Sequence, residues 1–430
     1  METEHHTAII VGAGPAGLAL SVVLGGWHPF FKSSKIFSQR YPQLDPILKR
    51  HNGSLLSLNL KDWVKNGIQP ADLFRALHHP RQKFVEIEQI AMAFEQKPNI
   101  DYLLLSRESV GGLWNNVPKN LLTLSPGQWM ELAFYPLYQH AMEAGIEIDA
   151  NALIIKHRLL DYYHSIPSRF GQEERIRTST NVEQIRPHSE GFLVKSRDTF
   201  TRKVKYYTCK YLILATGQRA SLRQLGIPGE ELDWVTPNYD KPEDFMGERI
   251  IIVGGGRSAD WAATELHDSG KQVTYVMRQD SSAHWRLINE SRWHLPYYAR
   301  IADILEAHSP KMETLYNTSI KAIRPDGTVL LEQTGDDRII ETDHVITEIG
   351  GVADYSILDG FPPLQLVEKH DAYRFQMHQA KIHPHNYESL EIPNLYLGGY
   401  LAAGIGLVVI AMHGTTYAIA ADILQREGKV

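Results

Sequence analysis

The chain has 430 residues, of which 43% are hydrophobic and 22% are charged. This composition is typical of a soluble globular protein with room for two domains. The formal net charge of -6 at pH 7 argues against a nucleic-acid partner. Only one cysteine is present, Cys209, so a disulfide redox centre cannot form within one chain. Nucleic-acid binding and redox catalysis by an internal cysteine pair are therefore not expected.

A buried strand is predicted at 8–11, followed directly by a glycine-rich turn and a helix. The turn contains Gly12, Gly14 and Gly17 in the spacing G-x-G-x-x-G, with Pro15 at the start of the helix. In this context a helix N-terminus presents free N–H groups and about half a positive charge to a pyrophosphate. The segment therefore predicts a dinucleotide-binding site.

A long insertion interrupts this first dinucleotide unit. The strand that should follow the first helix within a few residues is not recognisable there, and residues 27–98 read as loop and then helix, with helices at 71–77 and 81–96. The apolar run at 101–105 takes the place of that strand. The acidic residue that would bind the adenosine ribose is then either missing or shifted to Glu108, which also fits a solvated turn residue.

The middle of the chain is predicted to contain both helices and strands. Two histidine pairs, His78 with His79 and His383 with His385, have no third ligand at a regular spacing, so they are interpreted as loop residues and no metal site is expected. The predicted helices lie at 137–144 and 152–163, and the predicted strands lie at 178–185, 192–196 and 207–214.

A second dinucleotide turn follows a predicted strand at 250–253. It contains Gly254, Gly256 and, at the third position, Ala259, with Arg257 and Ser258 at the start of a helix that runs to about His267. Two such sites on one chain imply two dinucleotides. Electron transfer between two dinucleotides most often runs from a nicotinamide to a flavin.

The preference for NADH or NADPH depends on the charge at the end of the next predicted strand, at 272–277. Arg278 lies there, about 20 residues after the glycine turn, where an NAD-specific enzyme would carry an acid. A guanidinium can hold the 2′-phosphate with two parallel hydrogen bonds, and Arg257 can help. NADPH is therefore the expected nucleotide, although both arginines would also fit solvated surface positions.

The segment 395–421 carries no charged residue and contains five glycines. It fits a buried strand, a glycine turn and a buried helix better than a membrane span. No membrane span is therefore expected, and the protein is interpreted as cytosolic.

Together these patterns predict an α/β fold with two nested, Rossmann-like, three-layer dinucleotide-binding domains. The FAD-binding domain is expected to comprise 1–233 and 344–430, with the insertion at about 27–98. The NADPH-binding domain is expected at 234–343, inserted within the FAD-binding domain.

The motifs are similar to those of the class B flavoprotein monooxygenases. The resemblance rests on the two glycine turns, on Gly111, Gly112 and Trp114 after the second strand, and on the Ala-Thr-Gly segment at 215–217. A closer resemblance is to the oxidative stress-induced growth inhibitor branch of that group. That resemblance includes the insertion, the segment at 124–130 and the closing segment at 395–402. It implies FAD and NADPH as cofactors.

Two departures from the group pattern affect the expected reaction. The histidine-centred fingerprint that precedes the NADPH module has no counterpart at 234–239, and residues 348–351 replace the second Ala-Thr-Gly-Tyr. Both disfavour a Baeyer–Villiger reaction. The resemblance then implies oxygenation of a nitrogen or sulfur atom through a C4a-hydroperoxyflavin, with molecular oxygen and a small-molecule substrate as partners. An NADPH oxidase or reductase that releases peroxide, and a regulatory flavoprotein, remain alternatives, and a homo-oligomer is possible.

The same resemblance implies a flavin cavity with two walls. Gln128 is the expected polar group near the flavin ring, and Asn289 lies in a segment similar to the amine-contacting segment of ornithine and lysine N-hydroxylases, although a packed aromatic lid is an alternative interpretation. Thr216 and Gly217 are also expected to contact a cofactor. The wall residues are Gly112, Trp114, Ser125, Gln128 and Trp129 on one side and Gly399, Leu401 and Gly406 on the other.

Overall fold

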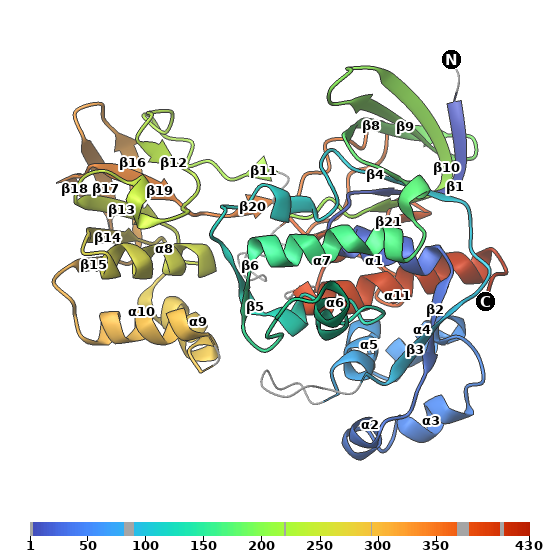
Figure 1. Ribbon diagram of the computed structural model, residues 1–430. Coiled ribbons are helices and arrows are strands. Elements are labelled where there is room, and N and C mark those ends of the chain that lie inside the picture. Colours follow the sequence, from blue (N-terminus) through green and yellow to red (C-terminus); the bar gives the residue numbers. More distant parts are fainter. Residues whose placement is uncertain (1–2, 81–89, 219–220, 294, 368–377, 405–407) are drawn as a thin grey trace. The chain divides into compact units, whose positions relative to one another are not determined.

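The computed structural model describes residues 3–80, 90–218, 221–293, 295–367, 378–404 and 408–430. They form two compact units, whose elements are labelled in Figure 1. Unit 1 comprises residues 1–116, 126–220 and 352–430, and unit 2 comprises 117–125 and 221–351. Unit 2 is thus nested within unit 1 in the sequence, and it extends beyond the 234–343 range expected for the second domain.

Unit 1 is built on a sheet whose centre is parallel. Strand β1 (Thr3–Val11) lies between β4 (Tyr102–Leu105) and β10 (Val204–Leu214), parallel to both. Ile10 is opposite Leu104 on one side and Ile213 on the other. The paired parts of these strands, 8–11, 102–105 and 211–214, are apolar and buried because both faces of a parallel sheet are covered. The predicted strand at 101–105 is confirmed as β4.

Further strands extend the sheet of unit 1 on both sides. Strand β7 (Ile176–Arg177) pairs with β4, and β21 (Leu395–Leu397) pairs with the end of β10, both in parallel. Strands β8 (Thr180–His188) and β9 (Gly191–Asp198) continue it in antiparallel pairing from β10. The three strands predicted between 178 and 214 are therefore confirmed.

The insertion differs from its predicted structure. Strand β2 (Trp27–Phe31) pairs in antiparallel fashion with β3 (Met92–Gln96), outside the main sheet. The prediction of loop at 27–31 and of helix at 92–96 was therefore wrong, because long-range strand pairing overrides the helix propensity of Met-Ala-Phe-Glu-Gln. Residues 81–89 lie outside the described part of the chain. The remaining elements of the insertion are α2 (Lys35–Arg40), α3 (Asp45–Arg50), η1 (Leu55–Ser57), α4 (Leu60–Lys65) and α5 (Pro70–His78), of which α5 confirms the helix at 71–77.

Helices of unit 1 pack around α11 (Val408–Arg426), the last element of the chain. It contacts α1 (Pro15–Leu24) and α5. The expected strand, turn and helix at 395–421 are present, and no helix among the described residues has the length and apolar character needed to cross a membrane. The other elements of unit 1 are η2 (Gly112–Asn115), η3 (Gly127–Trp129), α6 (Leu137–Ala144), β6 (Leu153–Ile155), α7 (Lys156–Arg169), η4 (Glu173–Arg175) and η8 (Gly399–Leu401).

Helix α6 begins and ends where the sequence predicted, whereas the helix predicted at 152–163 was placed too early. Residues 153–155 form β6, and α7 follows at 156–169.

Unit 2 contains a five-stranded parallel sheet with the order β12, β19, β13, β14, β15. A separate antiparallel sheet, β16 to β18, shares a core with it that includes Val253, Val276 and Val329. Both units therefore confirm the predicted α/β class with a glycine turn after a central parallel strand. The elements are β5 (Leu122–Pro126, across the unit boundary), β11 (Ser221–Leu222), β12 (Val235–Thr236), η5 (Pro242–Asp244), β13 (Arg249–Val253), α8 (Arg257–Asp268), β14 (Gln272–Val276), α9 (Ser281–Ser291), α10 (Pro296–Glu306), β15 (Met312–Leu315), β16 (Thr318–Ile323), β17 (Thr328–Gln333), β18 (Asp336–Glu341), β19 (His344–Thr347) and β20 (Gly351–Val352).

Candidate nucleotide-binding sites

The turn between β1 and α1 needs glycine at its first and third positions for packing. Gly12 has a φ of +111°, and a Cβ there would lie 2.5 Å from the carbonyl oxygen of Ala215. A Cβ on Gly17 would lie 1.9 Å from the carbonyl oxygen of Gly12. A Cβ on Gly14, in contrast, would have only the Cα of Gly112 as a neighbour, at 4.0 Å. The middle glycine therefore leaves an open surface at the helix N-terminus.

The first turn of α1 fits a bound pyrophosphate. Gly14 is the N-cap, Pro15 follows it, no side chain caps the helix, and the first turn carries no acidic residue. The N–H groups of the first turn have no partner within a helix and the dipole favours negative charge. The residues at this turn therefore fit the FAD pyrophosphate that the sequence predicts.

The segment around Gly112 closes against this turn. Gly112 has a φ of +58°, and a Cβ there would lie 2.7 Å from the Cα of Gly14. The N–H of Gly111 donates to the carbonyl oxygen of Ala13 at 2.9 Å. Trp114, on η2, is buried. The Gly111, Gly112 and Trp114 motif is thus held beside the first glycine turn.

Two later segments reach the same turn. Ala215 donates its N–H to the carbonyl oxygen of Val11 at 2.8 Å, which places Thr216 and Gly217 after β10 beside the end of β1. Gly399 has a φ of +64°, and a Cβ there would lie 3.0 Å from the Cβ of Ala16.

The Gly399 backbone is also fixed from the last helix. Its N–H donates to Oγ1 of Thr415 on α11 at 3.0 Å. Leu401 is completely buried, whereas Gly406 lies outside the described residues. The structure thus brings together four of the predicted cofactor-binding segments.

The other residues predicted for the same wall as Gly112 and Trp114 are divided between the units. Gln128 is buried on η3, and its N–H donates to the carbonyl oxygen of Ala150 at 2.8 Å. The guanidinium carbon of Arg75 lies 5.6 Å from the centroid of the Trp129 ring. Ser125 is in β5 and belongs to unit 2.

The turn between β13 and α8 repeats the glycine geometry in unit 2, although the first turn of α8 contains the buried Asp260. Gly254 has a φ of +148°, and a Cβ there would lie 2.4 Å from the carbonyl oxygen of Glu348. A Cβ on Gly256 would meet nothing within 4 Å, and Gly256 is the N-cap of α8 without a side-chain cap. Ser258 and the completely buried Ala259 follow in the first turn. This turn fits the pyrophosphate of a nicotinamide nucleotide.

A pair of arginines in unit 2 includes one that the sequence did not indicate. Burial, together with the positive charge of Arg278, lowers the pKa of Arg223. Arg278 follows β14 and Met277 in the chain, and its side chain is exposed. The guanidinium carbon of Arg257 lies 5.7 Å from the centroid of the Tyr298 ring. Arg223 has no fixed spacing from the glycine turn, so no sequence signal could have found it. Two guanidinium groups that repel each other favour an anion between them.

Helix α8 also contains a buried polar network that the sequence did not indicate. Oδ1 of Asp260 accepts hydrogen bonds from the hydroxyl of Tyr275 at 2.9 Å and from Nε2 of His284 at 2.7 Å. Nδ1 of His284 lies 3.1 Å from the hydroxyl of Tyr316. The network fixes the first turn of α8 against β14 and α9. Asn289, on α9, is exposed.

Two other predicted positions have clear environments. Cys209 is buried in β10, and burial raises the pKa of its thiol. Glu108 lies in a bend and forms an ion pair with Arg107 at 2.9 Å, which agrees with a turn residue.

The interpretation of His78 and His79 as loop residues without a third ligand was wrong. His78 ends α5, both side chains are buried, and His413 of α11 joins them. His383 is exposed in a loop, as expected.

Comparisons with known proteins agree with this arrangement. The family model described as pyridine nucleotide-disulphide oxidoreductase matches residues 89–399. Human oxidative stress-induced growth inhibitor 1 is 24% identical over 475 residues, covering 99% of this chain and 96% of the human protein. Bacillithiol disulfide reductase Bdr from Bacillus cereus has a similar structure, with a TM-score of 0.67, 19% identity and coverage of 98% of this chain and 100% of that chain. Ornithine N-hydroxylase from Kutzneria sp. 744 gives a TM-score of 0.60, 14% identity and coverage of 98% and 100%.

Proposed function

Because the chain belongs to the pyridine nucleotide-disulphide oxidoreductase family and is an oxidoreductase that uses FAD and NAD(P)H, we propose that it is an NADPH-dependent monooxygenase. Its substrate is a small molecule that is oxygenated on nitrogen or sulfur. The main support for this proposal is the pair of open glycine turns in a chain whose single thiol is buried.

The two turns have separate roles in this reaction. The β1–α1 turn at Gly14 holds the FAD pyrophosphate, and the β13–α8 turn at Gly256 holds the pyrophosphate of NADPH. FAD bound at the first turn would supply the redox chemistry that links oxidation of NADPH to reduction of molecular oxygen. NADPH, a proton, molecular oxygen and the substrate yield NADP⁺, water and the oxygenated substrate.

The state of Cys209 supports oxygen rather than a disulfide as the electron acceptor. A cysteine that exchanges electrons with a disulfide must be a thiolate and accessible. Cys209 is 1% exposed, and burial raises its pKa, so it is a packed strand residue. The chain offers no second cysteine.

The arginines support NADPH over NADH. Arg223 and Arg278 carry charges close enough for Arg278 to lower the pKa of Arg223. A 2′-phosphate placed between them would remove this repulsion and accept charge-assisted hydrogen bonds from both.

Two polar side chains are proposed to contact the reacting molecules. Gln128 has a buried side chain and follows the Gly111, Gly112 and Trp114 motif in the sequence. Its amide is proposed to form a hydrogen bond near the flavin ring. Asn289 is proposed to contact an amine substrate, for which its exposure leaves it accessible. Replacing Gln128 with Leu is expected to increase the fraction of oxygen released as peroxide, because the amide would no longer order the site.

An NADPH oxidase is the second candidate. It is favoured by residues 234–239, which form β12 and the following loop and carry no histidine-centred fingerprint. In this reaction the same electrons reduce oxygen to hydrogen peroxide without a second substrate.

One experiment separates these functions. The purified FAD-loaded protein is reduced with NADPH without oxygen and then mixed with air, with and without a panel of amines and sulfides. A monooxygenase produces an oxygenated product and less peroxide when the substrate is present. Stoichiometric peroxide with every compound would identify an oxidase, and failure of NADPH to reduce the flavin would contradict both enzymatic proposals and point to a regulatory role.

A further inference from the structure

Three histidines in unit 1 meet in the interior, outside the nucleotide-binding turns. His78 and His79 come from the end of α5, in the insertion, and His413 comes from the second turn of α11. All three side chains are buried. One ring nitrogen of each histidine lies within 4.8 Å of a ring nitrogen of the other two. This group, called the histidine cluster below, joins segments separated by 335 positions in the sequence.

Two nitrogen atoms of the cluster, one from His78 and one from His413, face each other. Nδ1 of His78 lies 2.5 Å from Nε2 of His413, closer than the usual ~2.9 Å of a hydrogen bond to nitrogen. The rings of His78 and His79 are stacked, with centroids 3.9 Å apart, and the ring of His413 is 4.7 Å from that of His78. Two imidazole nitrogens on one tetrahedral zinc ion, at ~2.05 Å each, are about 3.3 Å apart. The His78 and His413 nitrogens would therefore have to move apart by about 0.8 Å, and the ring of His79 would have to rotate out of its stack on His78 to join them.

A carboxylate lies on the opposite side of the His78 ring. Nε2 of His78 is 3.2 Å from Oε1 of Glu131. The other carboxylate oxygen, Oε2, accepts the N–H of Leu137 at 2.8 Å, which fixes the Glu131 side chain. A ligating histidine commonly donates its second ring N–H to a carboxylate, which selects the tautomer and orients the ring. Nε2 of His78 forms no hydrogen bond in this orientation, and a small rotation of the ring would let it donate to Oε1 of Glu131 and leave the lone pair of Nδ1 for a ligand.

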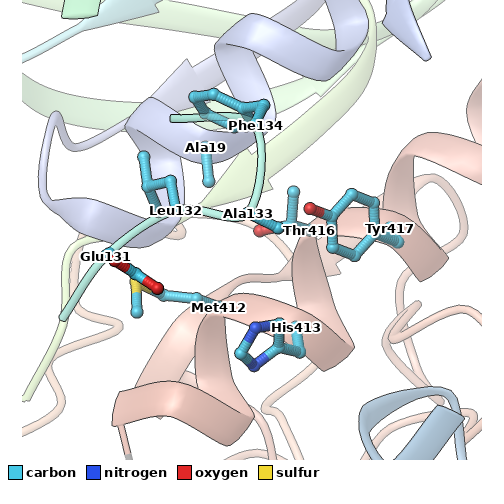
Figure 2. Close-up of a pocket in the computed structure, with 9 residues that line it drawn as sticks. All are labelled: Ala19, Glu131, Leu132, Ala133, Phe134, Met412, His413, Thr416 and Tyr417. Atoms are coloured by element: carbon cyan, nitrogen blue, oxygen red, sulfur yellow. The ribbon is translucent and has the colours of Figure 1, made fainter. Parts of the chain in front are cut away.

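A small cavity lies next to the cluster, beside His413 and Glu131. It has room for about one water molecule and is lined by residues from α1, α11 and the segment at 131–134 (Figure 2). Glu131 and His413 are both part of its wall, as Figure 2 shows. Of the three histidines, His413 borders this cavity, so a water molecule there would lie beside the cluster.

We propose that the histidine cluster binds one divalent transition-metal ion of the zinc type. One ring nitrogen each of His78, His79 and His413 are the ligands, a water molecule fills the fourth position, and Glu131 positions His78. Three imidazoles suit Zn²⁺ better than Mg²⁺ or Ca²⁺, which prefer oxygen ligands. The ion would connect the insertion to the last helix, and it does not depend on the reaction proposed above.

The first test measures metal in the FAD-loaded protein, purified without a metal-affinity tag. Mass spectrometry of the metal content is expected to give about one Zn²⁺ per chain after growth with zinc. The variants His79→Gln and His413→Gln are expected to lose the ion, whereas His383→Gln, in an exposed loop, keeps it. Glu131→Gln is expected to weaken zinc binding by about 10- to 100-fold because the ligand is retained but not oriented.

A second test uses only the wild-type protein, in case a variant does not fold. EDTA is expected to lower the melting temperature, since an ion bound to the folded state stabilises it. Added Co²⁺ is expected to restore the melting temperature and to give the visible absorption of a four-coordinate ion. FAD content and reduction by NADPH are followed separately, so that failure of the proposed reaction is distinguishable. No saturable uptake of Zn²⁺ or Co²⁺ and no effect of EDTA would overturn the proposal, as would equal zinc in the wild type and the His413→Gln variant.

Discussion

Oδ1 of Asp260 lies 2.7 Å from Nε2 of His284, and both side chains are completely buried. Asp260 belongs to the first turn of α8, directly behind the glycine turn of unit 2, and His284 belongs to α9. This pair therefore ties the nucleotide-binding turn to the next helix.

Replacing Asp260 with Ala is expected to lower the free energy of unfolding by about 3–5 kcal/mol, because His284 and Tyr275 would lose a buried partner. Urea unfolding gives this value. The matched control is Asp268→Ala at the other end of α8, where the exposed ion pair with Arg300 contributes at most about 1 kcal/mol. Equal losses in the two variants would contradict the special role of the buried pair.

The arginine pair predicts a selective effect on nucleotide use. Arg278→Ala is expected to reduce kcat/KM for NADPH by about 10- to 100-fold, as a charge-assisted contact of about 1.5–3 kcal/mol is lost, while the value for NADH hardly changes. Arg223→Ala is also expected to reduce kcat/KM for NADPH. If both arginines bind one phosphate, the double variant is expected to lose less binding free energy than the sum of the two single losses. Steady-state kinetics with both nucleotides measure this.

Arg324→Ala, at an exposed turn of unit 2, is the control for this experiment. A wild type that prefers NADH, or an Arg278→Ala variant that loses both nucleotides equally, would show that the arginines do not select the phosphate. The FAD content of every variant is expected to equal that of the wild type.

The open glycines predict that each cofactor can be removed separately. Gly14→Val is expected to fold but to lose FAD, since its side chain enters the space beside Gly112 where the pyrophosphate approaches. Gly256→Val is expected to keep its yellow colour and to lose reduction by NADPH. Absorbance of the flavin and anaerobic reduction measure both effects.

Gly17→Ala provides the contrasting variant. Its Cβ would lie 1.9 Å from the backbone oxygen of Gly12, so the turn itself must change and the melting temperature is expected to fall. If Gly14→Val retained FAD with wild-type affinity, the pyrophosphate would not lie at this turn.

The buried histidine of β2 predicts acid sensitivity. Burial, and secondly the charge of Lys97, lowers the pKa of His28 to about 4, against 6.5 as its ordinary value. Between pH 6.5 and about 4 the unfolded chain therefore binds more protons at this position than the folded chain. Its contribution to stability is complete above pH 6.5 and is lost as the pH falls, by up to about 1.4 kcal/mol per pH unit.

His28→Gln, which has no such proton, is expected to reduce the fall of the melting temperature between pH 7 and pH 5. His157→Gln, on the exposed side of α7, serves as the control and should follow the wild type. Parallel melting curves for wild type and His28→Gln over this range would contradict the prediction.

The sequence predicted what depends on local backbone geometry. The turns at Gly12 and Gly254 were found because positive φ values and close backbone contacts require glycine within a few residues of a buried strand. It did not reveal β2 and β3, whose pairing joins Trp27 to Gln96 across the insertion. Such contacts depend on the whole fold rather than on spacing.

The same limit applies to the candidate sites. Arg223, Asp260 and His413 reach their partners only through tertiary structure. Asp260 directly follows the second glycine motif, but nothing in the sequence indicates that it pairs with His284. His78 and His413 are 335 positions apart, so a search for regularly spaced ligands could not join them. The roles of Gln128 and Asn289 remain predictions.

The contacts between the insertion and α11 have a consequence for unfolding. Gln425, near the end of α11, donates from Nε2 to the carbonyl oxygens of Leu56 at 2.6 Å and Leu58 at 3.2 Å, and the ring of Tyr417 stacks on Phe74 at 4.4 Å. The insertion therefore covers much of the length of a helix whose other side packs on α1. Amide hydrogens of α5 and α11 should exchange at a common rate, as one cooperative block, and a shortened chain without residues 27–98 should expose the apolar surface of α11 and aggregate.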